Sequence, residues 1–103
     1  MPELIIKHGD RSPEKLVLER LRTTIGRSTR SDICIPDPFA SRVHAELRRE
    51  GDRFILQDLG SANGTTLVTR DSKITKLLAN QPHVLMHGDK LKLGETTLHL
   101  FVS

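Results

Sequence analysis

Short stretches of alternating apolar and polar residues follow one another along the chain, and each ends near Gly, Pro, Asp or Ser. Alternation with a period of two puts every second side chain on one face, which is typical of a half-buried β-strand. The pattern predicts strands over Leu4–Lys7, Lys15–Leu18, Arg22–Ile25, Ile33–Ile35, His44–Arg49, Arg53–Leu59, Thr65–Thr69, Lys90–Leu93 and Thr96–Val102. An all-β chain with about ten short strands is typical of a β-sandwich or a β-barrel.

The sequence predicts the conformation of some connections between these strands and leaves that of others open. Gly94 and Glu95 form a two-residue link that predicts a tight hairpin, because Gly supplies the positive φ of such turns. Residues 49–53 contain Gly51 and predict a similar connection. The stretch Ser72–His83 has no clear period, and it leaves open either a strand with a loop or a helical turn at Thr75–Asn80.

Length and composition indicate one small globular domain that spans residues 1–103. The chain is 36% hydrophobic and 28% charged, and only 3% of its residues are aromatic, so the core must consist of Leu, Ile and Val. No apolar run approaches the ~18 residues of a membrane span, and Met1–His8 is too short for a signal peptide. Cys34 is the only cysteine and cannot form an internal disulfide. We therefore expect a cytoplasmic, intracellular domain without a membrane partner.

The charge balance does not by itself favour a nucleic-acid binder. Sixteen Lys and Arg residues against 13 Asp and Glu give a net charge of +3, a mild excess that permits an anionic partner without requiring nucleic acid. Weak non-specific nucleic-acid binding remains an alternative that would rest on Arg27, Arg30, Arg42, Arg48 and Arg49.

The sequence predicts neither catalysis nor a metal or cofactor. Among the five histidines, only His83 and His87 have a spacing of four, and the neighbouring Pro and Gly argue against a helix that would use it. Ser41 and His44 lack an orienting acid in the pattern that nucleophilic catalysis needs. The glycine-rich signatures of nucleotide enzymes are also absent.

Three polar connections are rich in side chains that bind phosphate. They are Gly26–Asp32, Asp37–His44 and Gly60–Thr65. A rigid sandwich that presents its loops at one end is a common way to build a binding site. Each connection alone proves little, since an Asn-Gly pair usually marks a tight turn.

The ordered combination of motifs is far more specific than any one of them. It comprises Gly26-Arg27, Asp32-Ile33, Ser41-Arg42-Val43-His44-Ala45 and Asp58-Leu59-Gly60-Ser61-Ala62-Asn63-Gly64-Thr65, with a closing hairpin at Gly88–Gly94. Over nearly its whole length the chain resembles the forkhead-associated (FHA) domain family. The resemblance implies an eleven-stranded β-sandwich of two twisted, mostly antiparallel sheets. It also implies loops at one end that bind phosphothreonine in an extended peptide.

The resemblance places the phosphate on the first two loops. Arg27 suits a phosphate dianion because its guanidinium presents a planar fork of donors. A surface arginine paired with Asp32 or Asp37 is the alternative. Ser41 would add a hydroxyl donor, and Arg42 would act through its side chain or its backbone N–H.

The third loop would hold the peptide main chain. Asn63 can accept and donate hydrogen bonds at once, which suits an extended peptide regardless of its side chains. Ala62 stands where the family often has Thr, so the contact at Ala62 is expected to be backbone-only or absent. Gly64 would permit the turn and a close approach.

The remaining motif residues have supporting roles in this prediction. Gly26 is expected to bend the chain so that Arg27 points outward, His44 to brace the loops from a partly buried position, and Asp32 to support them. Arg30 and Phe39 are candidates for a specificity loop that reads residues after the phosphothreonine.

We therefore expect a module of a longer signalling protein, monomeric in isolation, that recruits a phosphothreonine-containing partner downstream of a Ser/Thr kinase. A protein-interaction domain of the same fold that ignores phosphate is the alternative. The sequence leaves the partner, the kinase and the conformation of residues 69–87 open.

Overall fold

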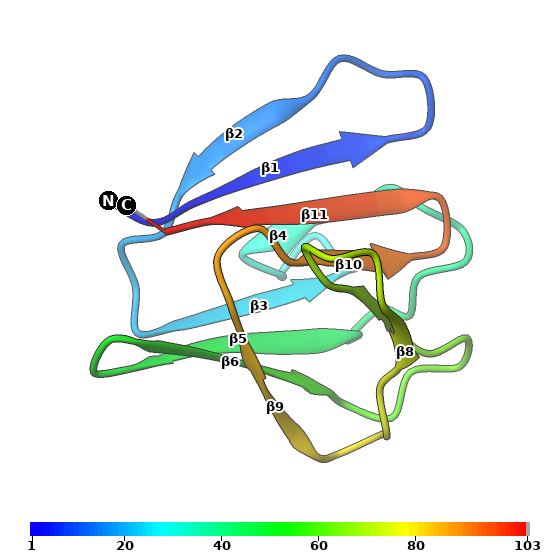
Figure 1. Ribbon diagram of the computed structural model, residues 1–103. Coiled ribbons are helices and arrows are strands. Elements are labelled where there is room, and N and C mark those ends of the chain that lie inside the picture. The colour runs from blue at the N-terminus through cyan, green and yellow to red at the C-terminus, as the bar shows by residue number, and fades with distance from the viewer. Residues whose placement is uncertain (103) are drawn as a thin grey trace.

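Eleven strands, and no helix, are found within residues 1–102, the part of the chain that this computed structural model describes (Figure 1). The strands are β1 (Glu3–His8), β2 (Glu14–Val17), β3 (Arg22–Gly26), β4 (Ile33–Cys34), β5 (Ala45–Glu50), β6 (Arg53–Asp58), β7 (Thr66–Val68), β8 (Ile74–Lys76), β9 (Pro82–Leu85), β10 (Lys90–Leu93) and β11 (Thr96–Phe101). The all-β class and the eleven strands are confirmed.

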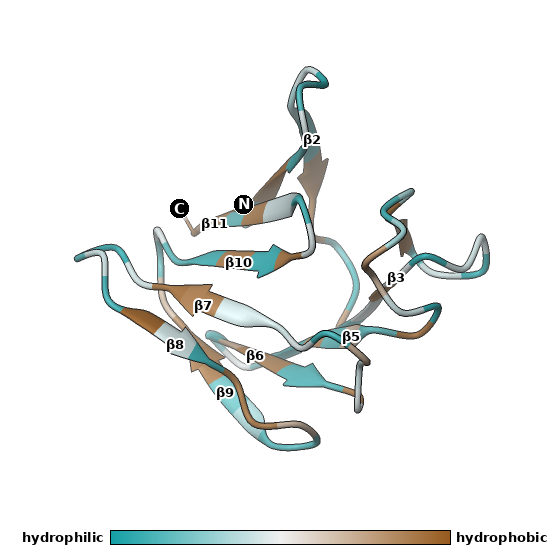
Figure 2. Cartoon of the chain, turned by 90° about the vertical axis from the view of Figure 1, so that its right-hand side faces the viewer, coloured by the Kyte–Doolittle hydropathy of each residue, from teal (hydrophilic) through white to brown (hydrophobic). Residues whose placement is uncertain are grey.

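The strands form two sheets that pack face to face. One sheet has the order β2-β1-β11-β10-β7-β8 and the other β4-β3-β5-β6-β9. Every pairing is antiparallel except that of β3 with β4, which is parallel. Figure 2 views the sandwich from one end and shows both layers twisting past each other. The predicted sandwich of mostly antiparallel sheets is therefore correct.

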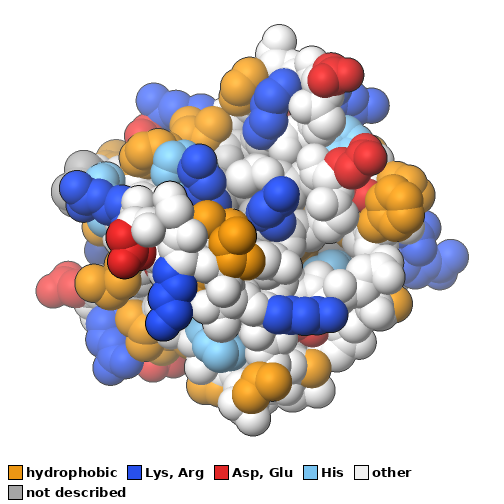
Figure 3. Space-filling view, turned by 45° about the vertical axis from the view of Figure 1, so that its right-hand side comes forward, with side chains coloured by type: hydrophobic (Ala, Val, Ile, Leu, Met, Phe, Trp, Pro, Cys, Tyr) orange, Lys and Arg blue, Asp and Glu red, His pale blue; other side chains and the backbone are white. Residues whose placement is uncertain are grey.

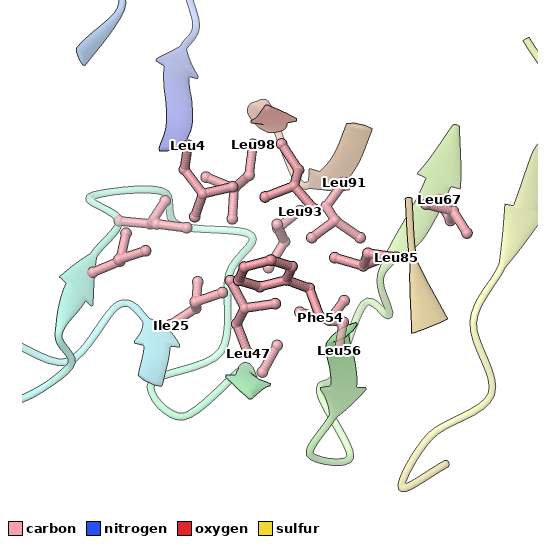
Figure 4. Packing of buried hydrophobic residues seen from close by; sticks show 14 of the residues in the cluster. Leu4, Ile25, Leu47, Phe54, Leu56, Leu67, Leu85, Leu91, Leu93 and Leu98 are labelled. Atoms are coloured by element: carbon pink, nitrogen blue, oxygen red, sulfur yellow. The ribbon is translucent and has the colours of Figure 1, made fainter. Parts of the chain in front are cut away.

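The core lies between the layers and consists almost entirely of aliphatic side chains. In β10 and β11 every second residue is buried, as the alternating sequence predicts. Figure 4 shows the ring of Phe54 surrounded by leucines from both sheets. The buried cluster comprises Leu4, Leu18, Ile25, Ile33, Ile35, Ala40, Ala45, Leu47, Phe54, Leu56, Leu67, Leu77, Leu85, Leu91, Leu93, Leu98 and Leu100.

The unclear stretch 72–83 contains strand and turn rather than helix. β8 runs over Ile74–Lys76, and β9 begins at Pro82 after a turn. Leu77 donates its backbone N–H to the carbonyl of Thr65, and Asn80 donates to that of Asp58. These bonds tie the stretch to strands far away in the sequence, so the helical turn at Thr75–Asn80 was the wrong alternative.

The loops of interest gather at one end of the sandwich. In Figure 1 the β4–β5, β6–β7 and β10–β11 connections lie at the right, while the marked chain ends and the β5–β6 turn lie at the left. Gly94, with φ +62°, and Glu95 form the two-residue β10–β11 hairpin that the sequence predicts. No helix long and apolar enough to cross a membrane occurs within the part of the chain that the structure describes.

Candidate functional site

Backbone hydrogen bonds join the first two loops directly. The N–H of Arg27 donates to the carbonyl of Ser41 at 2.9 Å, and the N–H of Ser28 donates to that of Arg42 at 3.1 Å. These bonds lie beyond the β3–β5 ladder, whose last paired residues are Ile25 and Ala45. They hold the two loops side by side next to the end of the sheet.

Gly26 is required by the closeness of this pairing. A Cβ at position 26 would lie 2.1 Å from the carbonyl oxygen of Arg42 and 3.1 Å from the backbone nitrogen of His44. Gly26 is not among the residues with positive φ. The expected role, a bend that turns Arg27 outward, is therefore replaced by a different one, a close approach of two backbones.

Arg27 is exposed at the edge of this paired segment, and only one of its side-chain nitrogens has a partner. Its Nε donates to the carbonyl of Ala40 at 3.1 Å, which fixes the guanidinium plane. Asp32 instead pairs with Arg20 at 2.8 Å, and Asp37 is completely buried. Within residues 1–102 neither carboxylate pairs with Arg27, so its two terminal nitrogens remain available to an anion.

The hydroxyl of Ser41 is oriented by the third loop. Its Oγ accepts the backbone N–H of Ala62 at 2.9 Å, so the hydroxyl proton stays available for a ligand. This contact also engages the backbone of Ala62. Its amide is engaged by Ser41 rather than offered to a peptide, so Ala62 acts in this structure as a support for Ser41.

His44 is fully buried and links the second loop to the third. The backbone N–H of Ser41 donates to Nδ1 at 3.0 Å, which requires Nδ1 to be unprotonated. Nε2 must then carry the proton, and it lies 3.1 Å from both the carbonyl oxygen of Gly64 and the hydroxyl of Thr65. Burial lowers the pKa of His44 despite the opposing effects of the Gly64 carbonyl and nearby carboxylates, so the ring is neutral.

Asp58 anchors the far side of the same network. Its carboxylate accepts the hydroxyl of Thr65 at 2.7 Å and the backbone N–H groups of Gly60 and Ser61 at 2.9 and 2.8 Å. Burial alone would raise the pKa of Asp58, but bonds from Ser61 and Thr65 outweigh it and hold the pKa below its usual value. A charged carboxylate thus closes the turn that leads to Asn63.

Asn63 projects from this turn and bridges to the second loop. Its Nδ2 donates to the carbonyl of Phe39 at 2.7 Å, and its side chain is exposed. The second amide proton and Oδ1 make no bond to the described residues. Gly64 has φ +78°, which favours glycine, and a Cβ there would lie 2.9 Å from Cε of Lys76.

The other predicted residues divide into an anchor and free side chains. The Asp32 carboxylate accepts the N–H of Thr24 at 2.9 Å, a bond that holds the pKa of Asp32 below its usual value. It therefore ties the β3–β4 loop to β3. The side chains of Arg30, Arg42 and Phe39 are exposed beside the loops, and Phe39 is 53% exposed.

Asp37 is a residue whose importance the sequence reading missed. Its buried carboxylate accepts the N–H of Phe39 at 2.9 Å, the N–H of Glu95 at 2.7 Å and the hydroxyl of Thr96 at 2.9 Å. Burial opposes ionisation, yet these bonds hold the pKa of Asp37 below its usual value. The Asp37-Pro38 pair before Ser41 is a turn signal that could have indicated this residue from the sequence. Its contact with Thr96 of β11 forms only in the folded chain.

The assembled site can bind an anion that has several acceptor oxygens. Three guanidinium groups, those of Arg27, Arg30 and Arg42, lie on adjacent loops. Ser41 directly precedes Arg42, and its carbonyl accepts the backbone N–H of Arg27. Charge-assisted bonds from such groups are the strong kind. Within residues 1–102 no group of His, Cys, Asp and Glu side chains suits a metal ion.

Comparison with known proteins gives the same picture. A model of the FHA domain family matches residues 23–94. An oxoglutarate dehydrogenase inhibitor from Corynebacterium jeikeium is 37% identical over 95 residues, which cover 92% of this chain and 60% of the relative. The chain thus spans about three fifths of that relative's length.

Two solved structures also resemble the chain. The FhaA FHA domain, in complex with the intracellular domain of Rv3910, is 29% identical with a TM-score of 0.80, and the match covers 97% of this chain and 99% of that one. A second structure comes from a structural and functional analysis of phosphothreonine-dependent FHA domain interactions. It is 28% identical with a TM-score of 0.76, and the match covers 98% of this chain and 97% of that one.

Proposed function

Because the chain belongs to the FHA domain family, we propose that it is a phosphopeptide-binding module that recognises phosphothreonine in an extended segment of a partner protein. The observation that carries this proposal is the pair formed by Arg27 and Ser41. Their backbones are bonded to each other, and each side chain is fixed by one contact while its remaining donors stay available. A phosphate monoester, with roughly −1.5 to −2 charges and three acceptor oxygens, fits such donors.

The geometry supports a division of labour among the loops. The terminal nitrogens of Arg27 and the hydroxyl of Ser41 hold the phosphate, and the Arg42 side chain adds positive charge beside them. Asn63 binds the peptide main chain through its unused N–H and Oδ1. Because Ala62 has no hydroxyl, the grip at that position is weaker than a Thr would give.

We also propose that this domain is a module of a longer signalling protein. The family consists of interaction modules, and the Corynebacterium relative is named an inhibitor. The domain accordingly has no catalytic activity of its own and recruits its partner after a Ser/Thr kinase has acted. It works as a monomer inside the cell.

Non-specific nucleic-acid binding has less support. Such binding favours a continuous basic surface. Arg48 lies 3.8 Å from carboxylate oxygens of both Glu46 and Glu50. Arg49 donates to the carbonyl of Gly51 in the β5–β6 turn, at the end opposite the loops (Figure 1). The five arginines therefore do not act as one patch.

The test is a titration of the domain with a degenerate peptide library at ~0.15 M salt, in matched phosphothreonine, phosphoserine and threonine forms. We expect micromolar affinity, about −8 kcal/mol, for the phosphothreonine form only. Arg27→Ala should abolish it because the forked donor is lost. The control is Arg53→Ala, which removes an equal charge at the start of β6, beside the β5–β6 turn, and should change the affinity less than twofold.

Each alternative has its own outcome. Equal affinity for the phosphorylated and plain peptides would refute a phosphate site and favour the phosphate-independent interaction domain. Binding that falls steeply with salt and responds equally to Arg27→Ala and Arg53→Ala would favour a non-specific polyanion surface.

A further inference from the structure

A groove leads away from the loop end onto the outer face of the six-stranded sheet. It has a volume of about 540 Å³. Phe39 and Asn63 line the end of the groove at the loops, and both belong to the loops already described. Its floor is formed by Thr66 and Val68 of β7, with Ile74 of β8 on one side and Lys92 of β10 on the other. A peptide bonded to Asn63 therefore lies at the mouth of this groove.

The strand register gives the floor an ordered pattern of charge and hydrophobicity. Nearest the loops, Thr66 pairs with Lys76 on one side and with Lys92 on the other, which places two ammonium groups in one row across the sheet. In the next outward-facing row, Val68 pairs with Ile74 on one side and with Lys90 on the other. Paired residues of neighbouring strands have Cβ atoms about 5 Å apart. A row with two lysines is thus followed by a row in which an aliphatic pair lies beside one lysine.

These side chains have unusually few partners of their own. Ile74 is 72% exposed although it is a large aliphatic residue on a strand. No carboxylate within residues 1–102 forms an ion pair with Lys76 or Lys92, and Glu95 is the only acidic residue that lines the groove. Figure 3 shows basic and hydrophobic side chains, with a few acidic ones, spread over the side of the molecule that is turned forward. Such a surface favours a ligand that brings both an acid and an aliphatic group.

We propose that this groove binds a flank of the same phosphorylated segment, beyond the residues next to the phosphothreonine, in which an acidic residue is followed by an aliphatic one. The acid lies on the row of Lys76 and Lys92, and the aliphatic side chain packs on Val68 and Ile74. The inference rests on the proposed phosphopeptide function, because continuity with Asn63 is what selects this occupant. A short peptide occupies only the loops, whereas a longer one also covers the sheet.

The experiment compares three synthetic phosphothreonine peptides with one central sequence taken from the library. One peptide ends three residues from the phosphothreonine on each side. The other two carry an added flank of Asp, Glu, Ser and Leu at the N-terminal or the C-terminal end, with Asp and Glu nearer the phosphothreonine in both. We expect one extended peptide to bind about tenfold more tightly than the short one. Its binding should also shift the amide NMR signals of Val68, Ile74 and Lys92.

Variants test whether the gain comes from the groove. Ile74→Asp should remove the tenfold gain and leave the affinity for the short peptide unchanged, which also shows that the domain is folded. Val84→Asp is the matched control, because Val84 is a 42% exposed aliphatic residue on β9 of the other sheet. Lys92→Glu should lower the affinity for the extended peptide. The variant domain should bind more tightly to a version of that peptide whose flank carries Lys instead of Asp and Glu.

The outcomes separate this inference from the proposed function. If the short peptide binds and neither extension improves its affinity or shifts the three amides, the groove proposal is wrong while the phosphopeptide site stands. A gain that survives Ile74→Asp and Lys92→Glu would place the flank elsewhere and overturn the proposal equally. If no phosphopeptide binds, the proposed function itself fails.

Discussion

The middle of the sandwich and its loop end both contain fully buried side chains, but these differ in chemistry. Between the sheets the fully buried side chains are aliphatic, as in Leu56, Leu91 and Leu98. At the loop end, polar groups such as Asp37, His44 and Thr65 are buried as completely. Apolar contacts are non-directional, whereas a buried polar group is stable only when its hydrogen bonds have the correct geometry.

This difference separates stability from ligand geometry. A change between the sheets should lower the free energy of unfolding without moving the loops relative to one another. A change in the polar network should cost less stability and yet disturb the positions of Ser41 and Asn63. The predictions below test this separation, and they are arranged by the expected change in the free energy of unfolding.

Leu56→Ala should give the largest loss of stability. Leu56 is fully buried on β6, so truncation removes apolar contacts and leaves a cavity, at a cost of about 3 kcal/mol. Affinity of the folded domain for the phosphothreonine peptide should stay within twofold. Urea unfolding and peptide titration measure the two quantities. Leu78→Ala deletes the same atoms at a 60% exposed position and should cost under about 0.5 kcal/mol.

A marked loss of affinity in folded Leu56→Ala would contradict the separation, because it would mean that the sheets and the loops move as one unit.

Thr65→Val should give a smaller loss of stability and a larger loss of affinity. The hydroxyl of Thr65 stands between Nε2 of His44 and the carboxylate of Asp58, and valine has nearly the same shape without it. We expect a cost of about 1–2 kcal/mol, because a buried acceptor and a buried donor each lose a partner. Affinity for the phosphopeptide should fall several-fold, since one of the bonds that fix the third loop against the second is lost.

Thr65→Ser is the matched control, because it keeps the hydroxyl and removes only the methyl group. It should retain nearly the wild-type affinity. Equal losses of affinity in Thr65→Val and Thr65→Ser would assign the effect to packing and would contradict the role given to the hydrogen-bond network.

The contrast between the two regions also explains how far the sequence could predict the structure. The period of two identified nine of the strands because their inward side chains are apolar. It missed β8, whose residues Ile74–Lys76 are all exposed, and β9, of which only Leu85 is buried. Edge strands such as these have no buried face over their full length, so they show no alternation to detect.

Prediction of the candidate site was limited in another way. The family motifs identified Arg27, Ser41 and Asn63, and the polar turn signals located their loops. The bond from Ala62 to Ser41 joins residues 21 positions apart, and the bonds from Glu95 and Thr96 to Asp37 join residues 58 and 59 positions apart. Nothing local in the sequence specifies such bonds, because they depend on how the loops close against each other.

Mild acid should give the smallest effect, and we expect it to act mainly on the loop end. The pKa of His44 is lowered by its burial, so the unfolded chain, with a histidine pKa near 6.5, binds a proton more readily than the folded one. The contribution of neutral His44 to the free energy of unfolding is therefore fully present above about pH 6.5, and it is lost as the pH falls below that value. The pKa values of Asp37 and Asp58 are also lowered, and the stability that these carboxylates contribute is lost only below about pH 4.

Urea unfolding at pH 7.5 and 5.5 isolates the histidine contribution. His99 has a pKa lowered by burial and by the charge of Lys90, so it acts in the same direction and needs its own variant. We expect His44→Gln to flatten the pH dependence more than His99→Gln does. Leu56→Ala should lower stability by the same amount at both pH values, because it changes no protonation. If His99→Gln alone flattens the curve, the buried histidine is not the acid-sensitive element, and the loop end would share the pH tolerance of the apolar core.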